Sequence, residues 1–219
     1  MSAGVVGVER RPDWWVPASL VLLSLVPAVA GTLRLGELAT SAPVTDANAR
    51  FFAAPLPVVL HVLAVVPYSI LGAFQFAPGI RRSHRTWHRR VGAGLLLAGV
   101  IAAVTGLWMA HFYPWPEGDG VALYAERLLV GTAMLVALVL AALAIPRRDF
   151  VAHGEWMTRA YALGIGAGTQ VLTHLPWFLL VGKPGETARS VLMGAAWVLN
   201  VGVAEWVIRR QRRRRLASR

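Results

Sequence analysis

The chain contains no cysteine, and charged residues make up only 15% of its 219 residues. Without cysteine it can form no disulfide, no cysteine-ligated zinc site, no iron–sulfur cluster and no covalently attached c-type haem. A soluble domain carries about 25% charged residues, so the shortage of charge argues against a soluble protein. Haem held by histidine is compatible with this composition.

Apolar sequence takes the place of the missing charge, since 56% of the residues are hydrophobic and the mean hydropathy is +0.55. Six apolar runs are each near the ~20 residues that cross a bilayer. The sequence therefore predicts an all-α, polytopic transmembrane helix bundle that forms a single integral membrane domain over residues 1–219. The predicted helices span residues 16–33, 56–78, 91–112, 121–145, 156–181 and 191–208, and a basic tail follows at residues 209–219.

Most of the 22 basic residues lie on one side of this bundle. They occupy residues 10–11, residues 81–90, residues 147–159 and the tail. The positive-inside rule then places both termini in the cytoplasm, and six crossings return the chain to the side on which it began. This pattern predicts a multi-pass protein of the bacterial cytoplasmic (inner) membrane.

The first apolar run has a second interpretation. Residues 16–30 follow a basic region and end in Ala28-Val-Ala30, which resembles a signal-peptidase site. Pro17 and Pro27 favour an uncleaved helix instead. The orientation of the other five predicted helices is the same in both cases.

The net charge of +11 could indicate nucleic-acid binding. The arginines, however, sit in short connections between apolar runs and in the tail. We therefore expect no nucleic-acid partner. The expected partners are the lipid bilayer itself and, at the Arg-rich tail, anionic lipid headgroups.

Histidines follow a pattern that occurs twice. Residues 84–90 and residues 153–159 both read His-x-x-Trp-x-x-Arg, and each opens a long apolar run. The first run closes at His111 and the second at His174, each shortly before a Pro-Trp pair. Histidine is expensive in lipid and is the commonest metal ligand. The pattern therefore raises the question of a bound cofactor.

The second and fifth predicted helices each carry a polar face at the helical period. Polar groups within a membrane normally point into the bundle, so these two faces are expected to border a shared interior. We expect Asn200 and Glu205 of the sixth helix to contribute, with Glu205 forming an ion pair with Arg159 at similar depth. The two faces comprise His61, Tyr68, Gly72 and Gln75, and Arg159, Leu163, Gly166, Gln170 and His174.

Depth separates the histidines into two groups. His61 and His174 lie about 7 Å and about 10 Å below the outer end of their helices, His111 lies at that edge, and His88 and His153 lie at the cytoplasmic end. The leading hypothesis is a b-type haem for electron transfer, ligated by His61 and His174 with His111 as the alternative ligand. His88 and His153 would form a second, cytoplasmic-side site.

Arginines at these two levels could pair with haem propionates. The candidates are Arg127 on the outer side and Arg90 or Arg159 on the cytoplasmic side. A copper site built from His111 and Met109 is an alternative. Each histidine also has an ordinary explanation, because a hydrogen bond to a neighbouring polar group would satisfy it.

Glycines in the fifth run predict close helix packing. Gly164 and Gly168 have the small-xxx-small spacing that lets backbones approach each other. The run Gly164-x-Gly166-x-Gly168 is not a nucleotide-binding loop, because it lies within a membrane span and no strand precedes it.

The second histidine motif resembles a bacterial family of predicted membrane proteins, domain of unknown function 2306. The resemblance is carried by His153-x-x-Trp156-Met157-x-Arg159-x-Tyr161-Ala162-Leu163, with the earlier His88-Arg-Arg-Val-Gly92. It covers roughly the second to fifth helices and implies a multi-helix inner-membrane protein with histidines in its loops, but no reaction. The chain departs from the family after Gly92, where Gly92-Ala-Gly94-Leu replaces a Gly-Arg-x-Tyr run.

The chain is more weakly similar to two-haem membrane cytochromes of the b561 kind. Those proteins place ligands on four successive helices. The fourth predicted helix, residues 121–145, has no histidine, so the analogy fails at one position.

Two other functional classes stay open. The first is a small-molecule transporter or permease that uses the polar interior. The second is an accessory membrane subunit with no catalytic chemistry. Both copies of the histidine motif start on the same side, which disfavours a transporter built from inverted repeats. No nucleophile, carboxylate pair or phosphate loop points to a hydrolase or kinase, so any enzyme activity is expected to be that of a membrane oxidoreductase.

Overall fold

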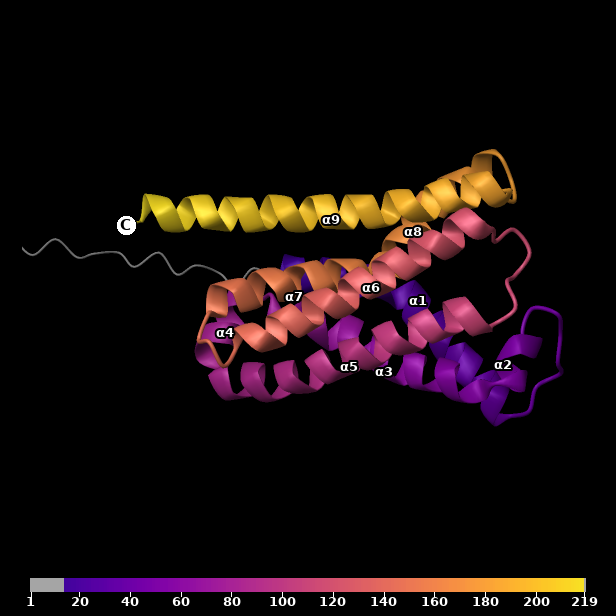
Figure 1. The fold of residues 1–219 in the computed structure, drawn as a ribbon, viewed down its shortest axis with the longest axis horizontal. Coiled ribbons are helices and arrows are strands. Elements are labelled where there is room, and N and C mark those ends of the chain that lie inside the picture. Colours follow the sequence, from indigo (N-terminus) through magenta and orange to yellow (C-terminus); the bar gives the residue numbers. More distant parts are fainter. Residues whose placement is uncertain (1–13, 219) are drawn as a thin grey trace, which may run out of the picture.

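The computed structural model describes residues 14–218. Arg10, Arg11 and Arg219, which belong to the predicted cytoplasmic-side charge, lie outside the described residues. Within the described part the chain forms helices and no strands (Figure 1). The helices are α1 (Trp15–Ala39), α2 (Ala49–Ala53), α3 (Pro55–Gln75), α4 (Pro78–Ser83), α5 (Arg85–Phe112), α6 (Val121–Ala144), α7 (Phe150–Gly164), α8 (Gly166–Leu180) and α9 (Glu186–Ala217).

The predicted all-α membrane bundle is confirmed. Within the described residues, five helices are long and apolar enough to cross a membrane, namely α1, α3, α5, α6 and α9. Two of them are longer than predicted at the basic end. Helix α5 begins at Arg85 rather than at residue 91, and α9 continues through the basic tail to Ala217. Figure 1 shows α9 running along one edge of the bundle.

The prediction of one continuous helix over residues 156–181 is wrong. The helix is interrupted at Ile165, which separates α7 from α8. Each half has 15 residues, or about 22 Å, which is shorter than the ~30 Å hydrocarbon core. Each nearby glycine lowers helix propensity by about 1 kcal/mol. Neighbouring helices also come close here, because a Cβ on Gly166 would lie 2.2 Å from Trp197 Nε1.

The half of the bundle that contains α7 is closely packed around Tyr68. This ring is only 1% exposed, and Cβ atoms on Gly99 and Gly164 would lie 2.7 and 2.8 Å from it. Tyr161 of α7 packs against Gly72 of α3 and donates its hydroxyl to the carbonyl oxygen of Ser69 at 2.6 Å. The expected contact between the second and fifth apolar runs is therefore present at this level.

The close packing expected from Gly164 and Gly168 is also present. A Cβ on Gly168 would lie 2.3 Å from the backbone oxygen of Leu23, so α8 and α1 touch through their backbones. Beyond the break, α8 packs against α9 and α1 rather than continuing the α3–α7 contact. The bundle opens at this point.

Candidate functional site

A partly open cavity of about 360 Å³ lies where the bundle opens. Ligand pockets typically measure 300–1,000 Å³, so this cavity has room for a small molecule. It is bounded by α1, α3, α5 and α6, by both sides of the break between α7 and α8, and by Trp197 of α9. Its walls are largely apolar, and their charged or hydrogen-bonding side chains besides Trp197 are Ser24, His61, Ser69, Arg127 and Gln170. The structure thus brings together the predicted residues His61, Arg127 and Gln170.

His61 is held in a defined tautomer. Its Nδ1 lies 3.0 Å from the Thr105 hydroxyl, and that hydroxyl donates its single proton to the Ile101 carbonyl at 2.6 Å. Thr105 must therefore accept a hydrogen bond from His61 Nδ1–H, which leaves the lone pair of the neutral imidazole on Nε2. An imidazole whose second nitrogen donates to a fixed oxygen is the usual form of a metal-ligating histidine.

Arg127 joins the cavity to a charged cluster at its outer side. The guanidinium pairs with Asp119 at 2.5 Å, and Arg189 Nε lies 2.7 Å from the other carboxylate oxygen. The second contact is an ion pair without hydrogen-bond alignment. The Asp119 side chain is only 1% exposed. Burial is the main cause that lowers the pKa of nearby Arg50; Asp119 opposes this effect, and Arg127, Arg34 and Arg189 add to it. One buried carboxylate is thus shared by Arg127 and Arg189.

His174 does not line the cavity that His61 lines. Its Nδ1 lies 2.8 Å from the carbonyl oxygen of Gln170, one turn earlier in the same helix, so Nδ1 carries the proton. Gln170 is the residue of this face that reaches the cavity. The predicted pairing of His61 with His174 stays a prediction, and the structure gives the two rings no shared cavity.

His111 and Met109 are also separated by the cavity wall. Met109 lines the cavity, whereas His111 lies at the exposed end of α5 with Nδ1 2.8 Å from the Tyr124 hydroxyl. Among the described residues, no three side chains of His, Cys, Asp or Glu gather as a metal site. The copper alternative therefore gains no support from the arrangement of these two residues.

His88 and His153 both lie at the other end of the bundle. They come from the starts of α5 and α7, which contact each other. His153 Nδ1 lies 2.9 Å from the carbonyl oxygen of Ala141, so this nitrogen carries the proton and Nε2 has the lone pair. Within the described residues, His88 Nδ1 is buried and has no hydrogen-bond partner.

The expected ion pair between Arg159 and Glu205 is present. Arg159 Nε lies 2.5 Å from Oε1 and Nη2 lies 3.1 Å from Oε2, a bidentate arrangement. The guanidinium also covers the ring of Trp156, 4.6 Å from its centroid. Arg159 is therefore engaged within the bundle and is a poor partner for a ligand.

The other polar residues expected in the interior have separate surroundings. Within the described residues, the Tyr68 hydroxyl and both amide atoms of Gln75 are buried without hydrogen-bond partners. Asn200 donates from Nδ2 to the carbonyl oxygen of Ala162 at 3.0 Å and accepts from the Thr169 hydroxyl at 2.7 Å. Asn200 thus bridges the break in the helix and does not line the cavity.

Sequence reasoning missed several residues of the outer region. Thr105 had a usable signal, because it is the sole hydroxyl residue within residues 91–112. Asp119 and Arg189 come from loop and helix-end positions with no periodic pattern. Trp197 and Gly166 meet only because α8 and α9 cross at the break. These contacts depend on tertiary structure and carry no local signature.

Several membrane-length helices around a largely apolar cavity with a few polar side chains define a polytopic helical membrane protein. The chain belongs to the family described as predicted membrane protein (DUF2306), whose model matches residues 58–208. The matched residues begin in α3 and end in α9, so the resemblance first seen in the histidine motif is confirmed. No curated protein and no solved structure matches the chain.

Proposed function

We propose that this protein is a membrane electron-transfer protein that binds b-type haem through the ring nitrogens of histidines. The observation that carries the proposal is the hydrogen bonding of His61 and His153. Each directs Nδ1–H to a fixed oxygen, Thr105 Oγ1 or the Ala141 carbonyl, and so keeps Nε2 available as a ligand. When bound, the haem would supply one-electron chemistry that the side chains of this chain lack.

The favoured ligand pair is His88 with His153. The helices that carry them, α5 and α7, contact each other, and the buried, unpartnered Nδ1 of His88 fits a site that is completed by a bound group. Positive charge suited to propionates is available from Arg90, which was expected in this role. Arg159 is excluded from this role by its ion pair with Glu205.

The outer site is proposed as a second position, with His61 as ligand and Arg127, which shares the single carboxylate of Asp119 with Arg189, as the positive partner. Both residues line the same cavity, which supports one axial ligand from this side. Participation of His174 or His111 would require either ring to move, because neither residue lines this cavity. The outer site is therefore ranked below the cytoplasmic-side pair.

An absorption spectrum of the purified full chain tests the proposal. Protein from cells with ample haem supply should show a Soret band that is lost in His88→Ala and His153→Ala. His84→Ala is the matched control, because His84 is exposed, lies one turn before His88 and is assigned no ligand role. Colourless wild-type protein, or an unchanged spectrum in both variants, would contradict the proposal.

A transporter of small anions is the second candidate, favoured by the broken helix. The amino-terminal end of α8, with its positive helix dipole, borders the cavity together with Arg127. Many transporters bind anionic substrates at such interrupted helices. Uptake that is lost in Arg127→Ala and kept in His88→Ala would favour this candidate. An accessory subunit without chemistry would tolerate all of these changes.

We further propose that the protein lies in the bacterial inner membrane with both termini in the cytoplasm. The broken run α7–α8 would then complete the sixth crossing. The tail arginines on α9 would contact anionic headgroups, as their exposure supports. A carboxy-terminal fluorescent-protein fusion should be bright and an alkaline-phosphatase fusion inactive; the opposite result would reject this topology.

A further inference from the structure

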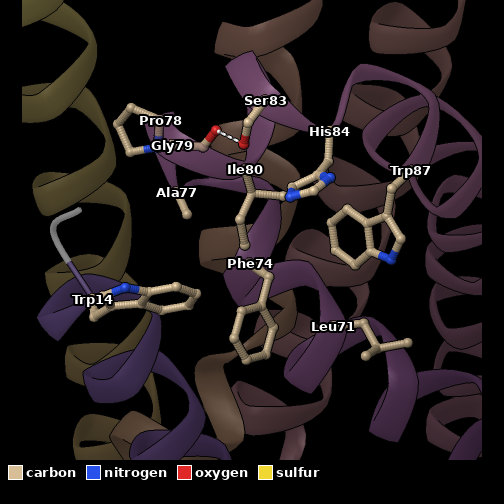
Figure 2. A pocket seen from close by; sticks show the side chains of 10 residues that line it. All are labelled: Trp14, Leu71, Phe74, Ala77, Pro78, Gly79, Ile80, Ser83, His84 and Trp87. Atoms are coloured by element: carbon tan, nitrogen blue, oxygen red, sulfur yellow. Dashed lines mark hydrogen bonds between the residues drawn. The ribbon is translucent and has the colours of Figure 1, made fainter.

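A second hollow, of about 640 Å³, lies at the end of the bundle that carries α4. Figure 2 shows Trp14 and Trp87 on opposite sides of it, with Phe74 and Ile80 between them. Trp14 precedes α1, Phe74 belongs to α3, Ile80 to α4 and Trp87 to α5. Four segments of the chain therefore build one apolar pocket.

The polar side chains of this pocket are few. Its lining includes only Ser83 and His84 besides the indole nitrogens of the tryptophans. The Ser83 hydroxyl donates to the carbonyl oxygen of Gly79 at 2.7 Å, which Figure 2 marks with a dashed line. Figure 2 also shows the His84 ring extending toward Ile80. An occupant of the hollow itself would therefore be hydrocarbon, with any polar group near His84.

Three arginines are sequence neighbours of residues that line this pocket, and we call them its basic rim. Arg81, Arg82 and Arg85 alternate along the chain with the lining residues Ile80, Ser83 and His84, and all three arginines are exposed. None of the three forms an ion pair with a carboxylate in the described part of the chain. By contrast, Glu155 and Glu205, at the same end of the bundle, are paired with other arginines.

We propose that this pocket binds one anionic phospholipid. An acyl chain fills the hollow between Trp14 and Trp87, and the phosphate is held by Arg81, Arg82 and Arg85. The apolar hollow suits an acyl chain, and the arginines without ion pairs suit a headgroup with net negative charge. A zwitterionic lipid gains less binding free energy from these arginines. The site is separate from the lipid contacts proposed for the tail and does not depend on haem binding.

Tryptophan quenching by brominated lipid tests the site directly. The full chain is placed in phosphatidylcholine nanodiscs containing a small fraction of brominated phosphatidylglycerol or brominated phosphatidylcholine. The part of the quenching that is lost in Trp87→Phe comes from Trp87. It therefore reports on the pocket and not on the other tryptophans. We expect this component to respond to phosphatidylglycerol at a mole fraction at least about fivefold lower than to phosphatidylcholine, since about 1 kcal/mol from a single arginine corresponds to about fivefold.

Two triple variants of equal charge change separate the rim from the tail. Arg81→Ala, Arg82→Ala and Arg85→Ala together should abolish the preference for phosphatidylglycerol. Arg213→Ala, Arg214→Ala and Arg215→Ala together should leave it intact. Equal quenching by the two lipids in the wild type, or a preference that survives the rim variant, overturns the proposal. A preference lost only with the tail variant also overturns it.

A pocket-filling variant tests the hollow without changing charge. Ile80→Trp should remove the phosphatidylglycerol that co-purifies with the wild type, as measured by mass spectrometry of extracted lipid. Leu22→Trp adds the same bulk to an exposed position of α1, 69% exposed, and should retain the lipid. Equal retention by the two variants rejects an occupied hollow. These readouts are independent of a Soret band, so failure of the haem proposal leaves them unchanged.

Discussion

Asn200 of α9 donates a hydrogen bond to the carbonyl oxygen of Ala162 at 3.0 Å, across the break in the fifth apolar run. The same amide accepts a hydrogen bond from Thr169 at 2.7 Å. Ala162 lies in α7 and Thr169 lies in α8, so one side chain serves both halves. A broken helix at membrane depth needs partners for its freed backbone groups, and here a neighbouring helix supplies one.

Replacing this amide should destabilise the protein. We expect Asn200→Leu to lower the free energy of unfolding by about 1–3 kcal/mol, because the Ala162 carbonyl and the Thr169 hydroxyl lose their partner in a buried site. Thermal unfolding in detergent measures the effect. Leu199→Ala is the control, since Leu199 is 55% exposed and adjoins Asn200. An equal or larger loss in the control would argue against a specific role for Asn200.

Replacing a glycine that contacts another helix should change stability more than replacing a glycine in open space. Gly168→Ala places a Cβ 2.3 Å from the Leu23 backbone oxygen, so α1 and α8 must separate, at a cost of about 1–3 kcal/mol. Gly94→Ala meets nothing within 4 Å and should be neutral or gain up to about 1 kcal/mol from helix propensity. Unfolding of the two variants in the same detergent gives the comparison, and matching stabilities would show that the close approach is dispensable.

The buried ion cluster at the outer side should matter more than an exposed pair in the same loop. Asp119→Asn leaves Arg127 and Arg189 without their shared carboxylate and should cost about 2–3 kcal/mol. Glu117→Gln breaks an exposed pair with Lys183 and should change stability little. Chemical unfolding of both variants measures the difference. Similar losses would mean that burial of Asp119 contributes nothing.

The pairing of Glu155 with Arg212 predicts a pH dependence. A hydrogen bond from Arg212 is the main cause that lowers the pKa of Glu155, so the charged carboxylate is favoured in the folded state. This contribution is present above the unfolded pKa of about 4.3 and is lost as pH falls through the lower folded value. Glu155→Gln should therefore lower Tm at neutral pH, and its difference from the wild type should shrink on acidification.

Variants of two arginines in the basic tail provide the comparison for this pH profile. Arg212→Gln should reproduce the Glu155→Gln profile, whereas Arg214→Gln should keep the wild-type profile because Arg214 forms no ion pair in the described part of the chain. A Tm difference between Glu155→Gln and the wild type that stays constant with pH would be inconsistent with the pair.

The length and spacing of apolar runs were sufficient to predict the helical bundle, because each crossing needs about 20 apolar residues. The break at Ile165 could not be read from the sequence. Gly164, Gly166 and Gly168 fit a continuous, closely packed helix as well as an interrupted one. Whether the helix is continuous or interrupted depends on Trp197 and Asn200, which come from another helix and leave no local pattern in the sequence.

The outcome at the candidate site is mixed. His61 was assigned to the interior from helical periodicity within α3, which is unbroken, and it lines the cavity. On the face that joined Arg159 to His174, Leu163 and Gln170 line the cavity from the two sides of the break. His174 lies one turn beyond Gln170 in α8 and does not line it, and periodicity alone does not show how far along a helix a cavity extends. Asp119 lies in a loop, where periodicity gives no information.

The interruption at Ile165 gives the two halves of a single membrane crossing different packing partners. Helix α7 rests mainly on α6, whereas α8 rests on α9 and α1. A pivot at this joint would let α8 move relative to α7 and resize the chamber beside Arg127. The histidines at the opposite end would keep their spacing throughout. A change in the size of the chamber at one face of the bilayer would thus leave the histidines at the other face in place.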